Sequence, residues 1–278
     1  MNFICYNFIY MEKNILIAGK DMVDGGSFAE GCSVSGRLVA ISGAEPDADD
    51  SRRRTIAERR AEVAAYEEAR SIEAKAGICT IEWNRSSPLS ARSFVLEAES
   101  IYGRIDEAVL LFDEEWFASS AEKMDAEEIA RVSDYMTVGF QYLALELISK
   151  FERANSAEQP ATLVFMLKEG PCTLDVMKVP ALKIGVNAIA SPLVAAAAAS
   201  FASFAENIAA LYADSRFVNI LLVRSDPDSD VSGHDDQLSR WLCSYMDELC
   251  EKKNVRHSVQ WIKSGAKFVQ SPFSLFRR

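Results

Sequence analysis

The sequence is poor in the residues that build metal centres and disulfide frameworks. Of 278 residues only two are histidine, and the six cysteines contain no Cys-x-x-Cys pair. A zinc site needs clustered thiol and imidazole ligands, and these spacings provide no recognisable set. We therefore expect a reduced, cytoplasmic protein without a structural metal.

Positive charge is also scarce. Thirty Lys plus Arg against 41 Asp plus Glu give a formal net charge of −11. The field of such a chain repels polynucleotides and anionic lipids. We expect neither a nucleic-acid partner nor a membrane partner.

No apolar run near the N-terminus is long enough to cross a membrane. Residues 1–10 are apolar and aromatic, but they lack both a positively charged start and a small-residue cleavage site. Met11 precedes the first strand-like run, so we expect it to be the biological start and residues 1–10 to be a non-native or disordered extension. Residues 11–262 then form one domain. The aromatic and basic tail 263–278 suits either docking on a partner or a frayed end.

Apolar runs alternate with helix-length segments along the rest of the chain. The predicted strands are 15–18, 38–41, 78–83, 105–112, 162–167, 217–223 and 255–262. The predicted helices are 55–74, 91–102, 126–154, 191–213 and 235–252. Strands joined by helices pair in parallel through right-handed crossovers. The pattern predicts an α/β doubly wound parallel sheet, a Rossmann-like three-layer α/β/α single domain.

Several strings in this order resemble one known family. Gly19 follows the first strand, residues 105–113 look like a fourth strand and 163–168 like a fifth, and an Ala-rich helix follows at 195–212. Over residues 15–262 the chain resembles the short-chain dehydrogenase/reductase family. The resemblance implies a Rossmann fold, an NAD(P) cofactor and oxidoreductase chemistry.

The catalytic positions of that family are not matched. Its dehydrogenases use a tyrosine as proton donor or acceptor and a lysine four residues later; none of the eight tyrosines here has a lysine at that spacing. The tyrosine position falls at residues 191–193 and the lysine position at 195–197. Lys168 replaces the supporting serine, and residues 110–113 replace the asparagine turn. Proton transfer and cofactor positioning are lost together.

The turn after the first strand is a weakened dinucleotide loop. The candidate cofactor-binding residues are Gly19, Lys20, Gly25 and Gly26. Glycines let backbone N–H groups approach a diphosphate, but Asp21 and Asp24 place negative charge beside it. The alternative is that Asp24 or Ser27 caps the following helix.

The end of the second strand leaves the choice of cofactor open. Residues 42–45 are followed by acids at 47, 49 and 50 and by arginines at 52–54. An acid there favours NAD and a base favours NADP. Both signs are available, and a solvated charged loop is the alternative, so the cofactor is none or NAD(P).

Charged residues also follow the strands near the middle of the sheet. Ligands of doubly wound sheets bind at the carboxyl ends of the strands. Asp113, Lys168 and Arg224 occupy such positions, and we take them as the candidate residues for binding a small charged molecule, without assigning a catalytic residue. The alternative is that they form ion pairs and caps over the sheet edge.

Two apolar helices predict the assembly. The segments 126–151 and 191–213 resemble the helices that form a four-helix contact between two subunits in this family, and small alanines at 195–199 permit close approach. We expect a homodimer through them, with core packing as the alternative.

Together these observations give two functional hypotheses. The first is a protein that has lost dehydrogenase chemistry and acts as a homodimeric binding, regulatory or scaffold protein, with a possible protein partner. The alternative is an NAD(P)-dependent short-chain oxidoreductase with an atypical active site, nearer the enoyl reductases. Residues 27–31 resemble the first helix of those enzymes.

Overall fold

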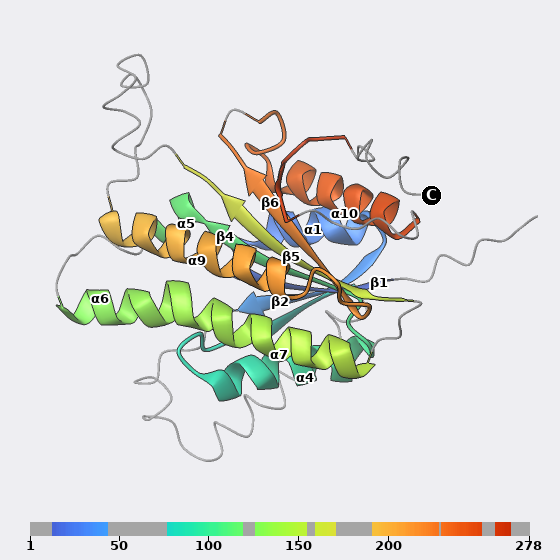
Figure 1. Cartoon of the computed structure of the whole chain (residues 1–278), viewed down its shortest axis with the longest axis horizontal. Helices are drawn as coiled ribbons and strands as arrows, with labels where there is room; N and C mark the ends of the chain where they lie inside the picture. Colours follow the sequence, from blue (N-terminus) through green and yellow to red (C-terminus); the bar gives the residue numbers. More distant parts are fainter. Residues whose placement is uncertain are drawn as a thin grey trace, which may run out of the picture.

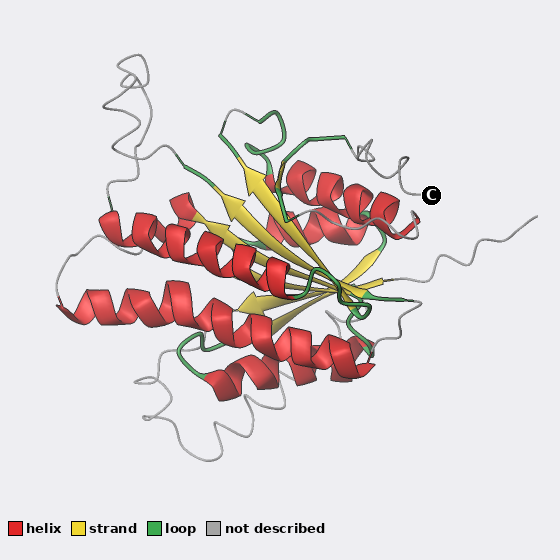
Figure 2. Cartoon of the chain, in the orientation of Figure 1, coloured by secondary structure: helices red, strands yellow, loops and turns green. Residues whose placement is uncertain are grey.

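A computed structural model gives the structure of the chain and describes residues 13–43, 77–118, 126–154, 159–170, 191–227, 229–251 and 259–267. A seven-stranded sheet in the order β3-β2-β1-β4-β5-β6-β7 forms its centre, and all neighbouring strands are parallel. The strands are β1 (Lys13–Met22), β2 (Arg37–Gly43), β3 (Ile78–Glu82), β4 (Glu107–Asp113), β5 (Ala161–Lys168), β6 (Val218–Ser225) and β7 (Trp261–Lys263). The predicted doubly wound sheet is confirmed (Figures 1 and 2).

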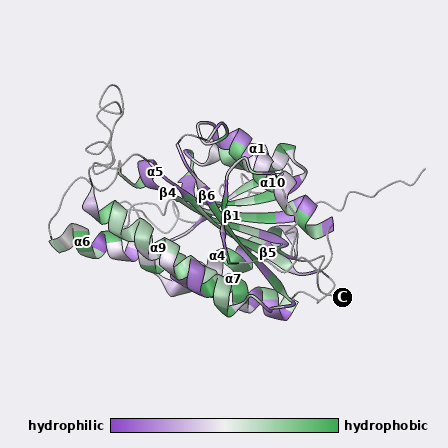
Figure 3. Cartoon of the chain, turned by 45° about the horizontal axis from the view of Figure 1, so that its top comes forward, coloured by the Kyte–Doolittle hydropathy of each residue, from purple (hydrophilic) through white to green (hydrophobic). Residues whose placement is uncertain are grey.

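Helices cover both faces of this sheet. They are α1 (Gly26–Val34), α4 (Pro88–Tyr102), α5 (Glu114–Ala118), α6 (Ala126–Val132), the π-helical turn η1 (Ser133–Val138), α7 (Gly139–Ala154), α9 (Pro192–Leu211) and α10 (Asp235–Glu251). One apolar core lies between the sheet and α4, α7 and α9, and a second lies between the sheet and α1 and α10. The middle segments of the central strands are apolar, whereas the helices carry apolar and polar residues on opposite faces (Figure 3).

The predicted elements match the observed ones with four corrections. The segment 126–154 is one helical stretch interrupted by η1. The sequence pattern did not predict α5, whose five residues are too few to show a helical period. Residues 252–258, which include the start of the predicted strand 255–262, lie outside the described residues, and within the described part β7 begins at Trp261. The predicted helix 55–74 and residues 1–12 and 268–278 also lie outside them.

The fourth correction concerns the start of α1. Its N-cap is Gly25, which makes no side-chain capping hydrogen bond, so the cap predicted at Asp24 or Ser27 is wrong. The side of α1 that faces α10 packs closely against it: a methyl group at Gly31 would lie 1.9 Å from Ser239 Oγ. Glycine allows the two helices to touch closely.

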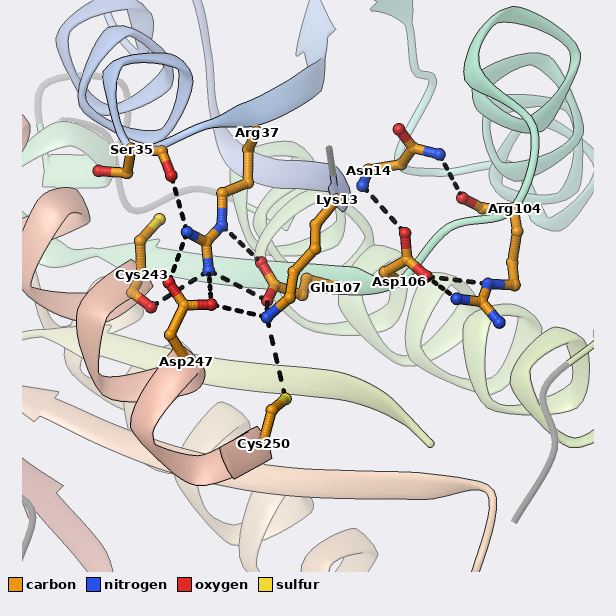
Figure 4. A network of polar contacts seen from close by, with 10 residues as sticks. All are labelled: Lys13, Asn14, Ser35, Arg37, Arg104, Asp106, Glu107, Cys243, Asp247 and Cys250. Carbon is orange, nitrogen blue, oxygen red and sulfur yellow. Dashed lines mark hydrogen bonds and ion pairs between the residues drawn. The ribbon is translucent and has the colours of Figure 1, made fainter. Parts of the chain in front are cut away.

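A charged network ties the amino ends of the strands to α10 (Figure 4). Arg37 and Glu107 are buried and pair at 3.1 Å, and Lys13 donates to Glu107 at 3.0 Å. Asp247 of α10 accepts from both cations at 2.7 Å. Burial by itself would raise the pKa of Asp247, but the hydrogen bonds from Arg37 and Lys13 outweigh it and lower that pKa. This network lies at the amino ends of the strands, at the edge opposite to their carboxyl ends, and ties α10 to the sheet.

Within the described residues α9 is the one helix long and apolar enough to cross a membrane by length and composition. Its apolar side packs on the sheet through Val194, Phe201 and Ala205, which belong to the core. Such packing is typical of a core helix in a soluble domain.

Candidate functional site

Four charged side chains meet at the carboxyl ends of β1, β4 and β5. Lys20 Nζ lies 3.3 Å from Asp113 Oδ2 and 2.7 Å from Asp235 Oδ2. Lys168 Nζ makes the same two pairs, at 3.3 Å with Asp113 and 2.7 Å with Asp235. We call this set of two ammonium and two carboxylate groups the edge network. The structure thus brings together Lys20, Asp113 and Lys168 of the predicted site residues.

Burial and charge pairing set the protonation of the edge network. Burial by itself would lower the pKa of Lys168, but Asp113 and Asp235 outweigh it and raise that pKa. Burial by itself would raise the pKa of Asp235, but the hydrogen bonds from Lys168 and Lys20 outweigh it and lower that pKa. Both groups are therefore held in their charged forms, and neither is prepared to exchange a proton near neutral pH.

Asp113 also starts the short helix α5. Its Oδ1 accepts hydrogen bonds from the backbone N–H groups of Glu115 at 3.1 Å and Trp116 at 3.2 Å. This is the capping geometry that anchors a helix N-terminus. The next residue, Glu114, accepts from the Gly170 N–H just after β5 at 3.0 Å. The edge network and these caps thus fix α5 across the carboxyl edge.

Arg224 is not part of the edge network. Its guanidinium lies 3.4 Å from Glu169 Oε1 and 4.9 Å from the centre of the Trp261 ring, at the β6–β7 side of the sheet. Trp261 in turn donates to Glu206 Oε1 at 2.6 Å. Among the described residues Arg224 thus pairs with Glu169, whereas Asp113 and Lys168 pair within the edge network.

The glycine turn makes contacts within the chain. Gly19 has φ +131°, and a methyl group there would lie 1.8 Å from the Leu111 carbonyl oxygen. A methyl group at Gly25 would lie 2.3 Å from the Lys20 carbonyl oxygen. The N–H of Gly25 donates to Asp21 O at 2.8 Å, and the N–H of Gly26 donates to Val23 O at 3.0 Å. Close backbone contacts explain two of the predicted glycines, Gly19 and Gly25, and the N–H groups of Gly25 and Gly26 are engaged within the turn.

Asp24 in this turn contacts α5. The Trp116 indole Nε1–H donates to Asp24 Oδ2 at 2.8 Å. The side chain of Trp116 therefore lies against the turn.

Asp21 points into the protein from the end of β1. Its carboxylate accepts from Ser42 Oγ at 2.6 Å, from Arg85 Nη2 at 2.9 Å and from the Tyr135 hydroxyl at 3.4 Å. Burial raises the pKa of the Tyr135 phenol, Arg85 opposes this and Asp21 adds to it. The sequence predicted that Asp21 would repel a ligand from the turn, but its charge is instead neutralised inside the protein by Arg85.

Arg85 is fully buried in an aromatic cage. Five rings surround its guanidinium, and their centres lie 4.3 to 5.7 Å from Cζ. The rings belong to Trp83, Trp116, Phe117, Tyr135 and Phe140. Nη2 donates to Gly19 O at 2.6 Å and to Asp21, whereas Nε and Nη1 have no hydrogen-bond acceptor in the described part of the chain.

The energetics of Arg85 are finely balanced. An unsatisfied buried donor costs about 1–3 kcal/mol, and more on a charged group. A desolvated cation–π contact returns up to about 2 kcal/mol. The rings therefore offset much of the cost, but they do not replace oxygen acceptors for a guanidinium.

No protein-family model matches the chain, and no curated protein does. Solved structures do match. A short-chain dehydrogenase/reductase from Serratia marcescens has 15% identity, covers 91% of this chain and 97% of its own, and has a TM-score of 0.52.

Two cofactor complexes are among the matches. The 3-ketoacyl-(acyl-carrier-protein) reductase from Brucella melitensis, complexed with NADH, has 15% identity, covers 90% of this chain and 96% of its own, and has a TM-score of 0.55. The RhlG/NADP active-site complex from Pseudomonas aeruginosa has 14% identity, 90% and 94% coverage and a TM-score of 0.53. The chain therefore has the fold of the short-chain dehydrogenases/reductases. At these identities the likeness concerns the fold.

The fold implies a dinucleotide, and the residues at the glycine turn do not fit one. The N–H groups of Gly25 and Gly26 are engaged by carbonyls of the same turn. Lys20 is directed into the edge network, and Trp116 lies against Asp24. A diphosphate bound at this turn needs free backbone N–H donors and a positive electrostatic environment. Among the described residues no group of three or more His, Cys, Asp and Glu could hold a metal ion either.

Sequence reasoning missed three important residues at this edge. Asp235 follows no strand, so a search of strand ends does not reach it; its place in the first turn of α10 is the only signal. Arg85 follows the strand predicted at residues 78–83, but nothing in the sequence indicates that it is buried. Tyr135 lies in η1, and a π-helical turn has no sequence period.

Proposed function

We propose that this chain is a binding, regulatory or scaffold protein with the short-chain dehydrogenase/reductase fold that has lost dehydrogenase chemistry. The edge network carries the proposal. In a doubly wound sheet the ligand binds where these four side chains lie, and here two lysines and two aspartates neutralise one another. The site presents paired ions instead of a proton donor.

Two further observations support this. No tyrosine is followed by lysine at the fourth position. The Tyr135 phenol, which does lie at the carboxyl edge, donates to a buried carboxylate and has a raised pKa, so it is a weaker proton donor than a free phenol.

The test is a calorimetric titration of the purified protein with NADH and with NADPH. We expect no binding heat and no thermal shift at millimolar cofactor. Micromolar binding of either would contradict the proposal. In that case Lys20→Ala, which removes the one cation of the turn that faces the sheet edge, would show whether the cofactor sits at this turn.

A second candidate is an NAD(P)-dependent oxidoreductase with an atypical active site. It is favoured by the solved structures, which are reductases and dehydrogenases, two of them with NADH or NADP bound. The comparisons support this candidate better than the first, whereas the side chains of the edge support the first. If a cofactor binds, Asp113 and Lys168 are the first residues to substitute in a screen of carbonyl and enoyl substrates.

We further propose that the protein is cytoplasmic and forms a homodimer through 126–151 and 191–213. The outer side of α9 supports the homodimer, since Ala195, Ala196 and Ala199 are exposed there. Small side chains let a second helix approach closely.

A further inference from the structure

Arg85 has more hydrogen-bond donors than the described protein satisfies. An arginine carries five N–H donors. The two on Nη2 are matched by Gly19 O and Asp21 Oδ1, and the three on Nε and Nη1 have no acceptor among the described residues. A fully buried cation with most of its donors unused is rare in proteins.

Two of the five surrounding rings separate Arg85 from solvent. Trp83, Phe117 and Phe140 are buried, whereas Trp116 and Tyr135 are partly exposed. Trp116 stands 5.3 Å from the guanidinium and is held by its hydrogen bond to Asp24 on the exposed turn. Trp116 therefore lies over Arg85, and its side-chain hydrogen bond to Asp24 is one of the contacts that hold it there.

We propose that Arg85 is a binding site for the oxyanion of a small molecule, a carboxylate or a phosphate, which enters when Trp116 moves off the guanidinium. A guanidinium recognises both groups through charge-assisted hydrogen bonds. Asp21 does not prevent this, because Ser42 and Tyr135 also donate to it and share its charge. The aromatic walls suit a ligand whose remainder is apolar. The inference rests on the proposed binding function, for which it supplies a ligand class.

The test compares two tryptophan variants by calorimetric titration with inorganic phosphate and with benzoate, at constant ionic strength. Trp116→Phe keeps a ring over Arg85 but removes the hydrogen bond to Asp24. Trp241→Phe is the matched control, because its indole donates at 3.0 Å to Ala266 O, away from this site. Loss of one hydrogen bond shifts the open population by roughly fivefold. We expect Trp116→Phe to bind one of the anions about fivefold more tightly than the wild type, and Trp241→Phe to equal the wild type.

Arg85→Gln completes the experiment. It should abolish anion binding while circular dichroism and thermal melting show a folded protein. If Arg85→Gln does not fold, the comparison of Trp116→Phe with Trp241→Phe by itself tests the inference. Equal affinities in the two variants, or no saturable binding of either anion by Trp116→Phe, would overturn the inference. If the protein binds only one of the two anions, that result identifies the oxyanion that the site takes, phosphate or carboxylate.

The NADH titration separates this inference from the proposed function. Micromolar NADH binding would refute the proposed function, whatever the anion result. Anion binding that is sensitive to Trp116→Phe, in a protein that binds no NADH, supports both.

Discussion

At the residue scale, the carboxyl edge satisfies its own charges. Lys20 and Lys168 each contact both Asp113 and Asp235, so the four charges cancel within a few ångströms. Removing one partner of a buried ion pair leaves the charge of the other partner uncompensated. The free energy lost in this way is larger than the net stabilisation that the intact pair provides. The edge network is therefore sensitive to any single neutralisation.

The pKa shift of Asp235 predicts how stability depends on pH. Its folded-state pKa lies below the ordinary value of 3.8, so its contribution to stability is present above that pH and is lost as the pH falls further. Asp235→Asn should lower the free energy of unfolding by roughly 2–3 kcal/mol at pH 7 and by much less near pH 2. Chemical denaturation at the two pH values measures both.

The neighbouring residue provides the control. The side chain of Asp236 is 40% exposed, against 9% for Asp235, and pairs weakly with Arg240 at 3.5 Å, so Asp236→Asn should change stability by less than about 0.5 kcal/mol at either pH. An equal loss in Asp235→Asn at pH 7 and pH 2 would show that its charge is not responsible.

At the element scale, the contact of α1 with α10 depends on one glycine. A methyl group at Gly31 would lie 1.9 Å from Ser239 Oγ and 2.5 Å from the Asp236 carbonyl oxygen. The second of these is backbone, so the helices themselves would have to move apart.

Gly31→Ala should therefore destabilise the protein by about 1–3 kcal/mol. Gly26→Ala is the control in the same helix: its nearest neighbour would be the Met22 side chain at 3.6 Å, so stability should stay equal or rise, since alanine favours helix. Thermal unfolding of both variants measures the difference. Similar melting temperatures would contradict the close contact described here.

Elements were more predictable than contacts. The buried strands were readable because both faces are covered, which leaves an unbroken apolar run such as residues 15–18. The meeting of Asp113 and Lys168 followed from strand order, since parallel neighbours end at one edge. Arg85 and Tyr135 were not readable, because their burial depends on a loop and a π-helical turn that have no sequence period.

At the scale of the whole molecule, the proposed dimer depends on the outer side of α9. Ala199 is exposed there, and a carboxylate at this position would be buried without a partner in a close helix contact.

The wild type should therefore elute at twice the monomer mass of 30.8 kDa in size-exclusion chromatography with light scattering, and Ala199→Glu should elute as a monomer. Ser244→Glu, on the exposed side of α10 across the sheet, should stay dimeric. A monomeric wild type would refute the dimer, and dissociation of both variants would place the contact elsewhere.

The position of β1 inside the sheet, between β2 and β4, has a consequence for synthesis of the chain. β1 pairs with β2, which follows within a few residues of α1, and with β4, whose first paired residue is Glu107. During translation one edge of β1 therefore stays unpaired until β4 has been made, and unpaired strand edges recruit other strands. The nascent chain is exposed to misassembly for the time that the ribosome needs to move from β2 to β4.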